Sequence, residues 1–234
     1  MQLTYPKDYI GKIICGDCLE IMKGIPDKSI DIVLTDPPYQ SPAKYYDTRK
    51  NYPKTLADFS LLDNFFTQFF QQLNRILSDK ARLYIFCNEN SYPLFFVKCY
   101  PLFKNIRCLI WDKKTAWSGY TWRHQYEMIL LGEKENAPII KTGDGDILKF
   151  RAVKADLRIH PAEKPIDLLE KILSKHREKL VLDPFLGSGT TILAAKRLKK
   201  NFIGIEISPD YVKIAEARLK AIPEAIPESL FNKE

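Results

Sequence analysis

The chain has 234 residues, of which 45% are hydrophobic and 28% are charged, a composition typical of one globular domain that excludes a disordered or collagen-like chain. No run of about 18 apolar residues occurs, so we expect no membrane-spanning helix, and the N-terminal segment lacks the apolar core of a signal peptide. The formal net charge of +7 is compatible with a polyanionic partner but does not by itself demand one.

The chain alternates between two kinds of apolar segment. Short runs rich in β-branched residues predict strands at 12–15, 30–35, 82–87, 106–111, 127–131, 180–183 and 201–207. Apolar residues at helical spacing predict helices at 61–77, 164–175, 190–199 and 209–221. Pro165 and Pro209 suit the first turn of a helix, where a missing N–H costs little. This alternation predicts an α/β fold with a doubly wound, mostly parallel sheet and helices on both faces.

Two polar segments interrupt this pattern, at 40–58 and within 112–160. The first alternates basic residues with tyrosines, and the second carries glycines and further basic residues. We interpret both as excursions from a single domain that spans residues 1–234, and as candidate surfaces for recognition of a partner.

The first candidate site is the sequence Asp36-Pro37-Pro38-Tyr39, which follows the predicted strand at 30–35. Ligands of open α/β sheets bind at the carboxyl ends of strands. The prolines remove two N–H donors, so that carbonyl oxygens and the Asp36 carboxylate remain as acceptors. Two adjacent acceptors suit a planar amino group with two hydrogens, and Tyr39 offers a flat face for an aromatic ring. The alternative is a proline-rich turn capped by Asp36.

The second candidate site lies between the predicted strand at 180–183 and the helix at 190–199. Its sequence is Asp183-Pro184-Phe185-Leu186-Gly187-Ser188-Gly189-Thr190-Thr191. Glycines at a strand-to-helix turn let the backbone approach a ligand closely. The spacing matches neither the dinucleotide fingerprint nor the P-loop, whose lysine is missing. A tight turn made of glycine for steric reasons alone is the alternative.

Glu206 falls near the end of the next predicted strand, about twenty residues after the glycine turn. An acidic residue at this distance commonly binds a ribose diol, because a carboxylate accepts from both hydroxyls. It could equally be a solvated carboxylate at a strand end.

The three motifs together resemble those of S-adenosylmethionine-dependent DNA amino-methyltransferases. Their order, with DPPY before FLGSG and IGIE, is similar to the β class of that family. The segment CGDCLEIMKGIPDKSIDIVLTDPPY resembles the opening segment of the class, and HPAEKPIDLLEKIL resembles the segment that precedes its glycine turn. The resemblance covers residues 12–39 and 160–215. It implies a Rossmann-like methyltransferase sheet with a circularly permuted order of motifs.

The resemblance also implies S-adenosyl-L-methionine as the cofactor and double-stranded DNA as the partner. By matching positions, Asp17 would face the cofactor adenine, and the HPAEKP segment would pack beside its methionine part. The cofactor-binding residues implied are Asp17, Cys18, His160, Lys164, Pro165, Asp183, Phe185, Gly187, Ser188, Gly189, Thr190 and Glu206. The catalytic residues implied are Asp36, Pro37, Pro38 and Tyr39.

The five cysteines are an odd number in a chain without an expected secretion signal, so we expect reduced thiols in a cytoplasmic protein. Cys15 and Cys18 have CxxC spacing, but no second pair or histidine cluster follows, and we expect no metal site. The sequence also lacks a Pro-Cys dipeptide, so the covalent mechanism of cytosine-C5 enzymes has no matching nucleophile.

The chemistry expected at DPPY is orientation of a weak nucleophile. The lone pair of an aromatic amine is delocalised into its ring. Hydrogen bonds from the two N–H groups to an ionised Asp36 and to the Pro37 carbonyl would direct that lone pair toward the methyl group. The base must leave the duplex to reach the pocket, with Tyr39 as its stacking face.

We expect DNA contacts from both polar segments, with basic residues on phosphates and tyrosine beside the flipped base. The candidate residues are Lys44, Tyr45, Arg49, Lys50, Lys54, Lys113, Lys114 and Arg123. A solvated loop with half-buried aromatics is the alternative for the stretch 113–124. Because the recognition portion is small for this family, we expect a second subunit or a short recognition sequence. The resemblance thus leaves room for a homodimer and for a cognate restriction endonuclease.

Adenine N6 is the expected acceptor, because DPPY is the commoner form among adenine enzymes of the family. The alternatives are cytosine N4 of DNA, an RNA or protein amide group, and a non-catalytic DNA-binding adaptor.

Overall fold

The computed structural model describes residues 3–38, 59–115, 121–134, 143–154, 156, 163–177 and 179–222, with only the backbone of 59–62. The strands are β1 (Lys12–Cys15), β2 (Ile30–Thr35), β3 (Leu77–Cys87), β4 (Asn105–Asp112), β5 (Tyr126–Glu133), β6 (Ile147–Lys149), β7 (Leu180–Asp183) and β8 (Asn201–Glu206). The helices are α1 (Cys18–Met22), α2 (Phe59–Ile76), α3 (Tyr92–Cys99), α4 (Ile166–Leu173), α5 (Thr190–Arg197) and α6 (Pro209–Lys220).

The strands form one open sheet in the order β1-β8-β7-β2-β3-β5-β4-β6. The first five strands in this order, β1, β8, β7, β2 and β3, pair in parallel with their neighbours among the five. β5 is antiparallel to both of its neighbours, and β6 pairs parallel to β4. The predicted doubly wound, mostly parallel α/β sheet is therefore confirmed.

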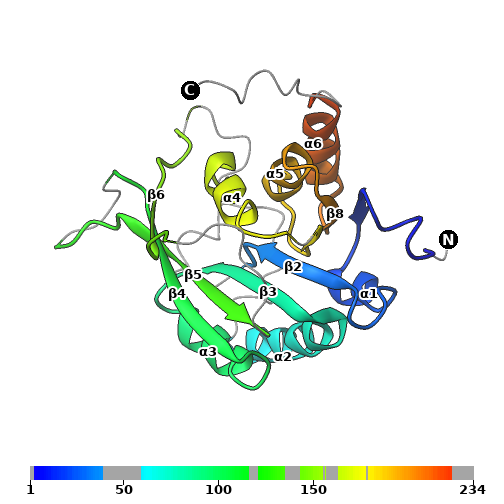
Figure 1. Ribbon diagram of the computed structural model, residues 1–234, viewed down its shortest axis with the longest axis horizontal. Coiled ribbons are helices and arrows are strands. Elements are labelled where there is room, and N and C mark those ends of the chain that lie inside the picture. Colours follow the sequence, from blue (N-terminus) through cyan, green and yellow to red (C-terminus); the bar gives the residue numbers. More distant parts are fainter. Residues whose placement is uncertain are drawn as a thin grey trace.

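Helices cover both faces of the sheet, with α1, α2 and α3 on one face and α4, α5 and α6 on the other (Figure 1). Successive side chains of a strand point to opposite faces. Val33 and Ile85 accordingly belong to the core under α2, whereas Leu34 and Phe86 belong to the core under α4 and α5. Burial on both faces explains why the central strands consist of consecutive apolar residues.

The chain winds outward from the middle of the sheet in two directions. From β2 it passes through α2 to β3, and from β7 it passes through α5 to β8 on the opposite side. Because α2 and α5 lie on opposite faces, the carboxyl ends of β2 and β7 border a topological switch point (Figure 1). Ligands of doubly wound sheets bind at such a crevice.

The structure corrects several expected elements. α1, α3 and β6 were not predicted, and β3 begins at Leu77 rather than at residue 82. α4 begins at Ile166 because Pro165 holds an extended backbone (φ −63°, ψ 134°) as the N-cap, whereas Pro209 is the first residue of α6, as expected.

The predicted excursion at 112–160 contains β5 and β6, so part of it belongs to the sheet itself. The predicted excursion at 40–58 lies outside the described residues. No helix in the described part of the chain is both long enough and apolar enough to cross a bilayer.

A cleft at the carboxyl ends of four parallel strands

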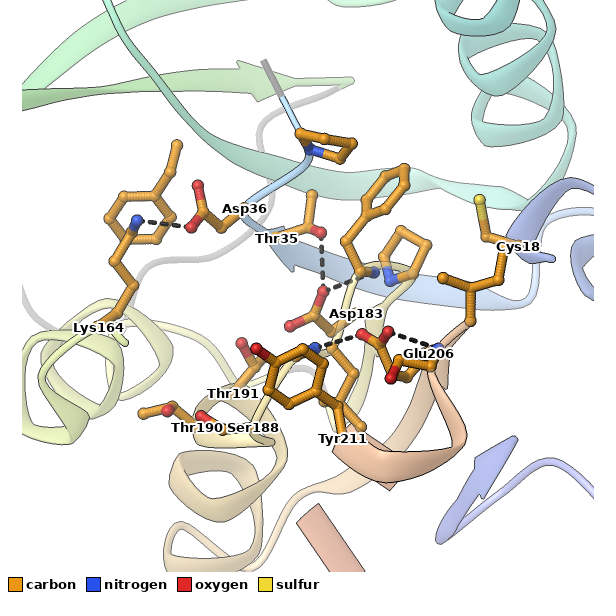
Figure 2. Close-up of a pocket in the computed structure, with 18 of the residues that line it drawn as sticks. Cys18, Thr35, Asp36, Lys164, Asp183, Ser188, Thr190, Thr191, Glu206 and Tyr211 are labelled. Carbon is orange, nitrogen blue, oxygen red and sulfur yellow. Dashed lines mark hydrogen bonds and ion pairs between the residues drawn. The ribbon is translucent and has the colours of Figure 1, made fainter. Parts of the chain in front are cut away.

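A cavity of about 320 Å³ opens where β1, β8, β7 and β2 end. Both predicted corners line this cavity, the first through Asp36 and the second through Asp183 and Ser188 (Figure 2). The strands that carry them are joined at their ends, where Thr35 Oγ1 donates to Asp183 Oδ1 over 2.7 Å. The DPPY corner and the glycine turn, which are about 150 residues apart in the sequence, therefore share one cleft.

The cavity brings together most of the residues singled out in the sequence. Those that line it are Asp17, Cys18, Asp36, Pro38, Lys164, Asp183, Phe185, Gly187, Ser188, Thr190 and Glu206. Pro37, Pro165 and Gly189 are close in sequence to lining residues but do not themselves line the cavity. Tyr39 and His160 lie outside the described residues.

Asp183 anchors the start of the glycine turn. Its buried carboxylate accepts hydrogen bonds from the Thr35 hydroxyl, from the Thr191 hydroxyl and from the Phe185 backbone N–H. Burial raises the pKa of Asp183 to about 6, and these three donors oppose the rise. The carboxylate thus fixes the loop to β2.

The turn itself requires glycine. Gly187 and Gly189 have φ of +55° and +92°, in the left-handed region that penalises a side chain. A Cβ at Gly189 would also lie 2.8 Å from the Cβ of Ala215 on α6. The glycines therefore allow both the bend and the close packing of α6 behind it.

Glu206, at the end of β8, binds the backbone of the glycine turn. Its Oε2 accepts from the Gly187 N–H at 2.7 Å, and its Oε1 accepts from the Ser208 N–H at 2.8 Å (Figure 2). The two backbone donors fix the orientation of the carboxylate. Each of its oxygens keeps a further lone pair with which it can accept a hydroxyl hydrogen.

Arg218 on α6 binds the turn on the side away from β2, a role that no local sequence pattern indicates. Its guanidinium donates to the carbonyl and the hydroxyl of Ser188, both over 2.9 Å, and to Glu163 Oε1 over 2.6 Å. An arginine near the end of an amphipathic helix is indistinguishable from a solvated one before the tertiary contacts are known. The clamp ties the glycine turn to the segment that precedes α4.

The junction between β1 and α1 contributes Asp17 and Cys18. Asp17 is the N-cap of α1 and accepts from the Leu19 N–H over 2.8 Å, while it remains exposed at the cavity. Cys18 is buried, and burial raises the pKa of its thiol to about 12. The thiol is therefore neutral and packs as a small apolar group, as the sequence indicated.

Asp36 belongs to a cluster of four alternating charges, which we call the cleft cluster: Asp36, Lys164, Glu127 and Lys113. Lys164 Nζ lies 2.6 Å from Asp36 Oδ2 and 2.9 Å from Glu127 Oε1, and Lys113 Nζ lies 3.0 Å from Glu127 Oε2. The other oxygen of Asp36, Oδ1, is buried and has no hydrogen-bond partner among the described residues. A buried carboxylate oxygen without a partner is costly unless a ligand supplies the donor.

Burial and charge act in opposite directions on this cluster. Burial raises the pKa of Asp36 above its ordinary value, and the Lys164 ammonium opposes that rise. For Lys164, burial disfavours the charge, but Asp36 and Glu127 together outweigh burial and raise its pKa. Lys164 therefore stays charged and gives Asp36 a permanent counter-ion, and it also lines the cavity in which the cofactor is expected.

The predicted DNA-contacting residues divide into three groups. Lys44, Tyr45, Arg49, Lys50 and Lys54 lie outside the described residues. Lys114 and Arg123 are exposed beyond the ends of β4 and β5. Lys113 is 18% exposed, pairs with Glu127 and lies 5.0 Å from the centre of the Trp111 ring, so it belongs to the cleft cluster instead of standing free in solvent.

Two further findings concern cysteines and metals. The five cysteines are free thiols, of which Cys87 and Cys99 are fully buried. Within the described ranges, no three His, Cys, Asp or Glu side chains gather closely enough to hold a metal ion.

Comparison with known proteins gives consistent matches. The profile of the DNA methylase family N6_N4_Mtase matches residues 30–217. The type II methyltransferase M.BglII of Bacillus subtilis is 26% identical over 268 residues, which cover 94% of this chain and 72% of M.BglII.

Solved structures share the fold. The M1.HpyAVI–SAM complex matches with a TM-score of 0.68 and 24% identity, over 89% of this chain and 98% of that one. The PvuII DNA methyltransferase, which is cytosine-N4-specific, matches with a TM-score of 0.73 and 19% identity, over 94% of this chain and 89% of that one.

Proposed function

The chain belongs to the DNA methylase family of the N6/N4 type, and from this premise we propose that it transfers a methyl group from S-adenosyl-L-methionine to the exocyclic amine of a flipped-out DNA base, adenine N6. The observation that carries the proposal is Asp36 Oδ1, a buried acceptor without a partner among the described residues, in the same cleft as the glycine turn. Such an acceptor fits an amine that brings its own N–H donors.

The residues of the cleft fit the cofactor. Glu206 would accept from the ribose hydroxyls, because its carboxylate is held by two backbone donors and still has lone pairs to offer. Gly187 and its neighbours let the backbone approach closely, and Asp17 lies exposed at the end of β1. S-Adenosyl-L-methionine, when bound, supplies an electrophilic methyl group on a sulfonium sulfur.

The chain's own groups would prepare the amine for attack. Asp36 Oδ1 would accept one N–H of the amine, and the Pro37 carbonyl would accept the other. These two hydrogen bonds would bias the nitrogen toward a pyramidal form whose lone pair points toward the methyl carbon. Methyl transfer would form an N–C bond as the S–C bond of the sulfonium breaks, with S-adenosylhomocysteine as the leaving group. The acceptors would stabilise the positive charge that develops on the nitrogen, and loss of one N–H proton to solvent would neutralise it. Lys164 keeps its proton throughout, because two carboxylates hold it charged.

The base reaches the cleft only after it leaves the duplex, and Tyr39 is the stacking face we propose for it. Lys114 and Arg123, both exposed, are proposed phosphate contacts, together with Lys44, Arg49, Lys50 and Lys54 from the segment after Tyr39. A homodimer and a cognate restriction endonuclease remain predictions from the family resemblance.

Cytosine N4 is the second candidate acceptor. One observation favours it, namely the shared fold with the cytosine-N4-specific PvuII enzyme. An amine on either base offers the same two N–H donors, so the open acceptor Asp36 Oδ1 suits both.

Nucleoside analysis tests the proposal. The protein is incubated with tritiated S-adenosylmethionine and mixed-sequence DNA that was copied in vitro and therefore carries no methyl groups. After digestion, label in N6-methyldeoxyadenosine is expected. Label in N4-methyldeoxycytidine would support the second candidate, and DNA without label would contradict both.

A further inference from the structure

Glu127 stands at the start of β5 and is the least expected member of the cleft cluster. Its side chain is 10% exposed, and its two oxygens face two different lysines, Lys164 at 2.9 Å and Lys113 at 3.0 Å. β5 runs antiparallel to β3, so this end of the strand lies beside the carboxyl ends of the parallel strands. Glu127 does not itself line the cavity, but it contacts Lys164, which does.

Lys164 is fixed from three sides. Its ammonium contacts Asp36 Oδ2, Glu127 Oε1 and the face of the Phe86 ring, whose centre lies 4.9 Å away. An ammonium paired with Asp36 alone could move between the two oxygens of that carboxylate, since Lys is a compact charge on a flexible stem. Glu127 limits this freedom, because it holds the ammonium at a second point while Asp36 Oδ2 holds it at the first.

We infer that Glu127 is a positioning residue for methyl transfer, which acts through Lys164 to keep Asp36 Oδ1 available to the acceptor amine. The inference rests on the proposed function. It requires no contact between Glu127 and the substrate. Without Glu127, the ammonium would compete with the amine for Oδ1, and Asp36 would lose its fixed orientation.

The charge balance of the cluster supports this role. Two lysines and two carboxylates compensate one another within the cleft cluster, and Lys113 neutralises the second oxygen of Glu127. Removal of the Glu127 charge leaves Lys164 with one carboxylate partner instead of two. Buried ion pairs that lose one member are strongly perturbed, so the effect should reach Asp36.

The chain offers a matched control on the same strand. Glu133, at the other end of β5, pairs with Arg82 at 2.7 Å, and its side chain is 12% exposed. The substitutions Glu127→Gln and Glu133→Gln each remove one buried carboxylate from β5 with little change of shape. Only Glu127→Gln should change catalysis, because Glu127 contacts Lys164, which lines the cavity, whereas Glu133 pairs with Arg82, which does not.

Steady-state kinetics on unmethylated mixed-sequence DNA give the first readout. Glu127→Gln should lower kcat by about 10- to 100-fold, the order expected from misplacement of a catalytic group, with KM for S-adenosylmethionine within about twofold. Glu133→Gln should leave kcat within about twofold of the wild type. Equal losses in the two variants would overturn the inference, because they would indicate a general loss of stability.

The pH profile gives a second readout that a purely structural role would not change. The titratable groups around Asp36 are Lys164 before α4, Glu127 on β5, Lys113 after β4, Asp183 on β7 and the thiol of Cys87 on β3. Lys164→Met removes a positive charge and should move the acidic limb of kcat to higher pH, whereas Glu127→Gln removes a negative charge and should move it lower. Lys164→Arg keeps the cation and should restore part of the activity.

A titration without turnover separates this inference from the proposed function. With aspartate labelled at its carboxyl carbon, NMR follows the Asp36 carboxyl in the wild type, Glu127→Gln and Glu133→Gln, with Asp36→Asn for assignment. A titration midpoint of the Asp36 carboxyl that is lower in Glu127→Gln, but not in Glu133→Gln, supports the link from Glu127 through Lys164 to Asp36. This result does not depend on methyl transfer, so it would stand even if the wild type proved inactive and the proposed function were wrong. An unchanged midpoint together with an unchanged kcat would overturn the inference.

Discussion

Each end of β5 carries a glutamate in an ion pair, but one of these ion pairs borders the cavity and the other lies away from it. At its start, Glu127 belongs to the cleft cluster, in which Asp36 Oδ1 has no partner among the described residues. At its end, Glu133 pairs with Arg82, which lies beside His176, whose other ring nitrogen meets the Tyr84 hydroxyl at 2.8 Å. We call these four residues the closed cluster.

The two clusters differ in whether they leave a buried hydrogen-bond acceptor without a partner. No member of the closed cluster lines the cavity, and Glu133, Arg82, His176 and Tyr84 serve as partners for one another. The cleft cluster keeps one acceptor for a donor from outside. A cluster of buried charges therefore indicates a functional site when one of its polar atoms faces a cavity without a hydrogen-bond partner. It indicates a structural role when its members pair with one another away from the cavity.

The largest expected effect is that of Asp36→Ala, which removes the open acceptor. We expect kcat to fall by about 10²- to 10³-fold, as on loss of a group that stabilises developing charge, while binding of S-adenosylmethionine measured by calorimetry persists. Asp31→Ala, at the opposite end of β2 from the cleft, is the control. Comparable turnover in Asp36→Ala and the wild type would remove Asp36 from catalysis.

The closed cluster should affect stability in place of activity. Burial first, and then the charges of Arg82, Lys200 and Lys175, lower the pKa of His176 to about 3. A group whose folded pKa lies below its unfolded value of about 6.5 contributes stability that is complete above pH 6.5 and is lost as pH falls toward 3.

At pH 5 the loss from His176 alone should be about 2 kcal/mol. Urea unfolding of the wild type and His176→Phe at several pH values measures this effect, because contributions of other groups, such as the raised pKa of Asp183, cancel in the difference. The variant should gain stability relative to the wild type as pH falls from 7.5 to 5. Parallel curves would mean that His176 does not titrate as the closed cluster requires.

A smaller effect is expected from Gly187→Val, on the cofactor side of the cleft. A branched side chain at φ +55° would distort the turn and occupy space in the cavity that it lines, so affinity for S-adenosylmethionine should fall about tenfold. Gly143→Val is the matched control, since Gly143 also has positive φ (+87°) but open space around it and no place in the cavity. Equal affinities in the two variants would exclude Gly187 from the binding site.

The smallest effect concerns the cations near the outer edge of the cleft cluster. Lys114→Ala and Arg123→Ala should each weaken DNA binding and reduce the slope of log affinity against log salt by about one. Lys213→Ala on α6, also exposed, should leave the slope unchanged. If Lys114 and Arg123 behave like Lys213, these two residues do not contact phosphates.

The sequence was sufficient for the central strands, because the runs IVL within Ile30–Thr35 and LVL within Leu180–Asp183 are apolar at consecutive positions, as strands buried on both faces are. It was insufficient for α3, where apolar residues occupy almost every position of YPLFFVKC, so that helix and strand periods could not be distinguished. The sequence was also insufficient for β6, which has only three residues and forms by pairing with β4, a tertiary contact that local sequence does not indicate.

Within the site, local motifs located Asp36, the glycine turn and Glu206, because each follows a recognisable strand. The contacts of Lys164 were not predictable, since its partners Asp36 and Glu127 come from distant segments that meet only in the folded sheet. Glu127 looked like the polar start of a strand. The Arg218 clamp was hidden for the same reason, as its contacts are entirely tertiary.

The most direct test of the account is a crystal structure of the protein with S-adenosylhomocysteine, the demethylated cofactor product. The account predicts the ribose at Glu206, the backbone of the glycine turn against the ligand, and the sulfur facing Asp36. A ligand bound outside this cleft, or a sulfur turned away from Asp36, would contradict it.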